Sequence, residues 1–209
     1  KQIGMEIFSS KDENKDDREI IDTSIKVLKK TGFKKAKVKI GNFKLFELLI
    51  QKLSIPQRWK DRLIKFYWNK EYFSQLLKRL DSNSDIDPFI VAGDHKTYLK
   101  MKKEYPKKMI AGRTYEEIIE RYERKINDPR LTKTGKTSSK IIKEFLKIKC
   151  SLKDAPKKLN AFYKKYNLNI SVAKEFFPIS TSNQKNLKFE FSASSGRGRE
   201  VEFYSSFIF

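Results

Sequence analysis

The sequence predicts an α+β domain: a sheet flanked by helices and interrupted by a helical insertion. Alternating apolar and polar residues indicate strands near both ends of the chain and near residues 35–41. Apolar residues at helical spacing dominate the middle. At 209 residues, the chain is long enough for one domain with a sizeable core and short for two. We therefore expect a single domain that carries an insertion.

The first part of the chain alternates between strand and helix patterns. Residues 1–8 place Ile3, Met5 and Ile7 on one face of a predicted strand. A helix over 16–30 has acidic residues in its first turn and lysines in its last, before Gly32. The further elements expected are a strand over 35–41 and helices over 41–50, 56–68 and 70–80. This order is typical of an α/β or α+β sheet domain.

A polar break at residues 81–85 introduces a lysine-rich helical region. Its candidate helices cover 95–104, 114–126, 136–149 and 154–165. We expect residues 1–81 to form the first part of the sheet core, 82–167 the insertion, and 168–209 the return to the core.

The last segment has two alternating apolar runs, after a possible helix that ends near Phe177-Pro178. The runs flank the turn Gly196-Arg197-Gly198 and predict a hairpin. The turn is either a plain hairpin turn or a tip that contacts an anion. The inward aromatic residues of such a hairpin would face a small ligand.

The charge pattern favours a solvated surface. The net charge is +21, but most of the cations are lysines dispersed along the chain, and lysine is the weaker choice for bidentate phosphate recognition. A basic nucleic-acid-binding module therefore stays only a lower alternative. We expect a soluble protein, because no signal-peptide pattern and no run of ~20 apolar residues occurs.

Metal and thiol chemistry are disfavoured by composition. His95 is the only histidine and Cys150 the only cysteine, so no zinc-type ligand cluster is expected. One cysteine also excludes an internal disulfide framework and favours a cytoplasmic setting. We expect Cys150 to be a packed thiol on an insertion helix, and no cofactor, because phosphate-binding glycine loops are missing.

Glu6 and Tyr204 form the most informative candidate pair. A carboxylate would accept a hydrogen bond from one imidazole N–H, and a phenol would engage the other ring nitrogen. Gln2 lies on the same face of the predicted strand as Glu6 and would contact an amino or carboxylate group. From the residues alone, a solvated strand face and a core tyrosine explain the pattern equally well. Arg199 either binds an anion or is exposed to solvent.

Three segments resemble one family. Gln2-x-Gly4-x-Glu6, the helix that begins Asp17-Arg18-Glu19, and the strand that ends at Gly41 resemble the block after motif 2 in histidyl-tRNA synthetases and their paralogue, the regulatory subunit of ATP phosphoribosyltransferase. The resemblance implies a class II synthetase-like core with an antiparallel sheet. It also implies histidine binding by Gln2, Glu6 and Tyr204, with Phe203 where the family has another tyrosine.

The choice between the paralogues depends on other segments. Residues 110–122, from Ile110-Ala111-Gly112-Arg113 onward, and Phe191-Ser192-Ala193-Ser194 resemble the regulatory subunit. Arg199 has the spacing of the catalytic arginine of the synthetase, although the adjacent Gly and Asp are altered, which keeps a synthetase fragment as the alternative.

The regulatory resemblance implies a non-catalytic subunit that binds L-histidine as effector and assembles with a catalytic short-form ATP phosphoribosyltransferase. The segments that carry motif 1, the motif 2 arginine loop and motif 3 have no match here, so we expect an internal piece of a longer protein.

Overall fold

The structure is a computed structural model that describes Met5, Ile7 and residues 12–104, 112–173, 177, 187–197 and 207–208. The chain divides into two compact units. The sheet unit comprises Lys1–Lys52 and Glu144–Phe209, and the helical unit comprises Leu53–Lys143. The helical unit is therefore inserted in the chain between two parts of the sheet unit. Its limits differ from the predicted insertion, 82–167.

Helix α1 (Glu13–Lys30) opens the described part of the sheet unit. Asp12 caps it, because its carboxylate accepts a hydrogen bond from the backbone N–H of Lys15 at 3.1 Å. Gly32, with φ of +85°, takes the left-handed conformation that ends the helix after Thr31. Ile21 and Ile25 are buried, so this helix has the predicted apolar face.

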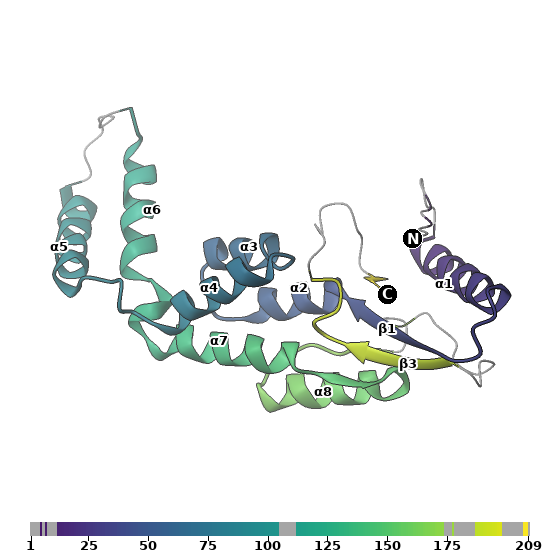
Figure 1. Ribbon diagram of the computed structural model, residues 1–209. Coiled ribbons are helices and arrows are strands. Elements are labelled where there is room, and N and C mark those ends of the chain that lie inside the picture. Colours follow the sequence, from purple (N-terminus) through teal and green to yellow (C-terminus); the bar gives the residue numbers. More distant parts are fainter. Residues whose placement is uncertain are drawn as a thin grey trace. The chain divides into compact units, whose positions relative to one another are not determined.

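The sheet has four strands: β1 (Ala36–Asn42), β2 (Lys149–Ser151), β3 (Leu187–Ser192) and β4 (Phe207–Ile208). Their order is β2-β3-β1-β4. Strands β1 and β3 are parallel, with Val38 opposite Phe189, whereas the other two pairs are antiparallel (Figure 1). The α+β class is confirmed. The predicted antiparallel sheet is wrong, since the sheet is mixed.

Connection length explains the mixed sheet. A parallel pair requires a crossover connection, and the chain between β1 and β3 includes the whole helical unit. The predicted C-terminal hairpin is also wrong for the described strands, because β3 and β4 lie on opposite sides of β1. Strand β3 pairs with one edge of β1, and β4 pairs with the other edge.

Two helices cover the sheet unit's core. They are α2 (Phe43–Lys52) and α8 (Ala155–Lys165), and the end of α7 (Lys133–Leu146) joins them. The ring of Phe145 lies 6.3 Å from the rings of Phe46 and Tyr163. The Tyr163 hydroxyl donates to the carbonyl of Leu45 at 3.2 Å, and burial raises its pKa above the ordinary value. This aromatic cluster connects segments more than 100 residues apart.

The helical unit is built from short helices around an apolar core. Its elements are α3 (Gln57–Lys65), α4 (Lys70–Asp81), α5 (Pro88–Glu104), α6 (Tyr115–Ile126), a 3₁₀ turn (Pro129–Leu131) and most of α7. Helices α5 and α6 lie side by side (Figure 1), joined by the Tyr98 hydroxyl to Glu123 at 2.7 Å and by Lys125 to Asp94 at 2.9 Å.

Several helix boundaries differ from the predictions. Helix α5 begins at Pro88 and not near residue 95, because proline fits the first helical position and Asp87 accepts a hydrogen bond from the N–H of Phe89. Helix α7 ends at Leu146 and not at residue 149, because Lys147 and Ile148 form a turn that leads into β2. Residues 168–173 and Phe177 are not helical, and the rest of the possible helix before Phe177 lies outside the described residues. No helix within the described ranges is long and apolar enough to cross a membrane.

Candidate functional site

The end of β1 contacts the turn that follows β3. Residues 193–197 form a turn after β3, in which the N–H of Ser195 donates to the carbonyl of Ser192 at 3.0 Å. The turn lies in close contact with Gly41, because a Cβ added at this position would lie 2.7 Å from the Ser195 Cβ. Glycine is therefore required at position 41 for the turn to contact the sheet.

The predicted histidine-binding residues lie outside the described residues. They are Gln2, Glu6, Phe203 and Tyr204, and the same holds for Arg199. The structure neither brings these side chains together nor separates them. Strand β4 begins three residues after Tyr204 and pairs with Gly41 and Asn42.

The structure describes two residues of the predicted first strand, Met5 and Ile7. Met5 and Ile7 are not in a strand and are 40% and 36% exposed. The prediction that they lie on one face of a strand is therefore wrong at these two positions.

Cys150 lies in β2, and not on an insertion helix as predicted. The thiol is partly buried. Burial raises its pKa, Asp154 and Glu190 add to the rise, and Lys158 opposes it. Less thiolate therefore forms at neutral pH, which is unfavourable for a nucleophile. These surroundings support a packing role for Cys150.

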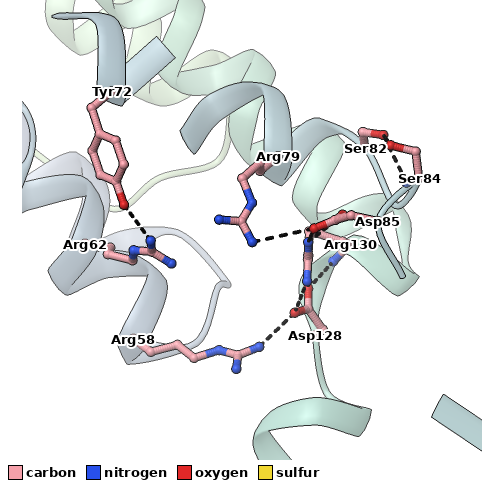
Figure 2. Close-up of polar contacts among 9 residues, drawn as sticks. All are labelled: Arg58, Arg62, Tyr72, Arg79, Ser82, Ser84, Asp85, Asp128 and Arg130. Carbon is pink, nitrogen blue, oxygen red and sulfur yellow. Dashed lines mark hydrogen bonds and ion pairs between the residues drawn. The ribbon is translucent and has the colours of Figure 1, made fainter. Parts of the chain in front are cut away.

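The helical unit contains a charged network that the sequence did not reveal (Figure 2). Asp128 is 6% exposed and accepts two hydrogen bonds from the guanidinium of Arg130, at 2.8 and 3.0 Å. It also accepts one from Arg58 at 2.8 Å. Arg130 donates in addition to Asp85 at 2.8 Å and lies over the Trp59 ring. One buried carboxylate thus fixes two guanidinium groups.

Asp85 completes the network at the surface. Partial burial opposes ionisation of Asp85, but hydrogen bonds and charge from Arg130 outweigh it and hold its pKa below the ordinary value. Arg79 lies 3.5 Å from the same carboxylate. The only local signal for this network in the sequence was Asp128-Pro129-Arg130, which also suits a plain turn.

A groove of about 660 Å³ opens beside this network, on the helical unit. Its cationic lining residues are Arg58, Arg113, Arg121, Arg124 and Lys125. Glu117 and Glu120 are its acidic lining residues. The groove combines several guanidinium groups in a concave surface, which is suited to an anionic ligand. The sequence pattern does not reveal this group of arginines, because they are outnumbered by the lysines dispersed along the chain.

These features describe an α+β protein whose sheet unit carries a helical unit between β1 and β3. The family model described as histidyl-tRNA synthetase matches residues 1–123. The chain belongs to the histidyl-tRNA synthetase family, as its sequence motifs predicted.

Its curated relatives share one name. The chain is similar to the ATP phosphoribosyltransferase regulatory subunit of Rhizobium rhizogenes, at 25% identity over 100% of this chain and 60% of the relative. The protein of that name from Rhizobium johnstonii is 25% identical over 82% of this chain and 50% of the relative. The one from Clostridium acetobutylicum is 37% identical over 41% of this chain and 20% of the relative.

The chain spans half to three fifths of the length of the two rhizobial relatives. No solved structure matches it at a significant level.

Proposed function

We propose that this chain is part of a regulatory, histidine-sensing subunit of ATP phosphoribosyltransferase. The carrying observation is that one relative with this name matches the chain along its whole length and others with the same name match 41% to 82% of it. In this role the protein has no catalytic activity of its own. It assembles in the cytoplasm with a short-form catalytic subunit, as a hetero-oligomer, and transmits feedback inhibition by histidine to the first step of histidine biosynthesis.

The proposed histidine site combines the two ends of the chain. Glu6 accepts a hydrogen bond from one imidazole N–H, Tyr204 engages the other nitrogen, and Gln2 contacts the histidine backbone. Phe203 contributes an apolar wall, and Arg199 contacts the carboxylate. The pairing of β4 with β1 supports this proposal, because β4 follows Tyr204 by three residues and ties the end of the chain to the sheet.

Regulation would follow from differential binding. Histidine stabilises an inhibited arrangement of the hetero-oligomer only if it binds that arrangement more tightly than the active one. By linkage, the catalytic subunit then changes the affinity for histidine by the same factor.

Isothermal titration of the 209-residue chain with L-histidine tests the site. We expect saturable binding that Glu6→Ala weakens by about tenfold or more, because a hydrogen bond to a charged group is lost. The matched control is Glu19→Ala, which removes an exposed carboxylate of α1 and should leave the affinity unchanged. Absence of binding, or equal affinity in the Glu6 variant, rejects the site.

The second candidate is a fragment of a histidyl-tRNA synthetase catalytic domain. The description of the matching family favours it, together with Arg199 at the spacing of the catalytic arginine. Histidine-dependent exchange of pyrophosphate into ATP by the full-length protein distinguishes the two functions. We expect no exchange above background. Exchange that is lost in Arg199→Gln would favour the synthetase.

A further inference from the structure

The basic groove of the helical unit has no part in the proposed histidine site. All its lining residues belong to Leu53–Lys143, whereas the predicted histidine ligands belong to the sheet unit. Ligand binding in this groove is therefore independent of the proposed regulatory function.

Two of the arginines in the groove are available for a ligand. Arg113 and Arg121 are exposed and make no hydrogen bond or ion pair with any described residue. Arg113 follows Gly112, whose φ of +75° turns the chain into the start of α6. Two free guanidinium groups in one groove repel each other, and a bound anion would relieve this repulsion.

The acidic residues of the groove are already engaged. The carboxylate of Glu117 accepts the backbone N–H of Thr114 at 2.9 Å, as part of the capping box of α6. Glu120 forms an ion pair with Arg124 in the same helix. These carboxylates neutralise Arg124 and the helix start, and leave Arg113 and Arg121 without a counter-charge among the residues that the structure describes.

Arg58 lines the groove with a guanidinium group whose position is already fixed. Its guanidinium is held by the buried Asp128, which Arg130 fixes in turn (Figure 2). A side chain held in this way loses less conformational entropy when it binds an anion.

We propose that this groove binds a small ligand with two or three linked phosphate groups. Its volume, about 660 Å³, lies within the range of small-molecule sites. Guanidinium groups match phosphate oxygens with paired hydrogen bonds, and a diphosphate carries enough charge to satisfy several of them. A nucleic acid would need a longer uninterrupted cationic track, which the lining carboxylates break.

Inorganic pyrophosphate and inorganic triphosphate, titrated calorimetrically into the 209-residue chain at fixed salt, test the proposal. We expect saturable binding that Arg121→Gln and Arg113→Gln each weaken by about tenfold. Both positions are exposed, so the variants should keep the circular dichroism of the parent chain. The matched control is Arg18→Gln, an exposed arginine on α1, which should leave the affinity unchanged.

Three results would overturn the proposal. The first is no saturable binding of either phosphate compound. The second is equal weakening by Arg18→Gln, which would indicate a response to total charge. The third is a single-stranded RNA or a pentaglutamate peptide whose binding is weakened by Arg121→Gln but is not displaced by pyrophosphate. That result would assign the groove to a nucleic acid or to an acidic protein segment.

Discussion

Gly135 illustrates how a single residue sets the packing of the helical unit. An added Cβ at this position in α7 would lie 2.5 Å from the carbonyl oxygen of Leu80 and 2.9 Å from that of Pro129. Backbone atoms cannot swing aside as a flexible side chain can. The helix therefore approaches the end of α4 closely only because this residue has no side chain.

We predict that Gly135→Ala destabilises the helical unit by about 2 kcal/mol, through overpacking. The control is Gly93→Ala in α5, where an added Cβ meets nothing within 4 Å. That change should stabilise the unit by about 0.5 to 1 kcal/mol, since alanine is the better helix former. Urea unfolding followed by tryptophan fluorescence measures both, because Trp59 and Trp68 both belong to this unit. Equal stability of the two variants would contradict the assigned contact.

At the scale of elements, Asp128 joins α3 to the turn that precedes α7. Its side chain is 7% exposed, and that of its partner Arg130 is 12% exposed. Such a pair gives little net stability when intact, since both charges have been removed from water. Removal of the Asp128 carboxylate alone, however, leaves the Arg130 guanidinium as an uncompensated buried cation.

We predict that Asp128→Asn lowers the free energy of unfolding of the helical unit by about 3 kcal/mol. The contrast is Glu120→Gln, which removes an ion pair whose side chains are 54% and 59% exposed and should change stability by less than about 0.5 kcal/mol. Chemical unfolding followed by tryptophan fluorescence gives both values. A loss of the same size in the two variants would show that the burial of Asp128 is unimportant.

At the scale of the whole molecule, the chain is organised as a sheet unit with a helical unit inserted into it. The helical unit is one continuous segment, Leu53–Lys143, and it contains its own buried apolar residues, among them Trp59, Phe73 and Leu76. The sheet unit needs two separate segments of chain. The two units are therefore expected to differ in their capacity to fold alone.

We predict that a polypeptide of residues 53–143 folds independently, with helical circular dichroism and a cooperative thermal transition. A polypeptide of residues 53–126 is the control. It lacks Asp128 and the part of α7 in which the Ser139 hydroxyl donates to the carbonyl of Leu77 at 3.2 Å. It should melt without cooperativity. A cooperative transition in the shorter polypeptide, or none in the longer one, would contradict these unit boundaries.

The sequence by itself determined the local elements and the family. Helix α4 and the end of helix α1 fall where the sequence pattern predicted them, although α1 begins at Glu13 and not at residue 16. Helical hydrogen bonds join residues a few positions apart, so local sequence is informative about them. The segments that resemble the histidyl-tRNA synthetase family led to the correct family. The histidine site, from Gln2 and Glu6 to Tyr204, stays a prediction from that resemblance.

Only the tertiary structure decided which elements meet. Local pattern contains no information on strand partners, so the sequence favoured a hairpin where β3 and β4 instead flank β1. It likewise placed the insertion at 82–167, although α3 and α4 belong to the helical unit and α8 to the sheet unit. Arg58 and Asp128 are 70 residues apart in the chain, and their ion pair exists only because folding brings them within 2.8 Å.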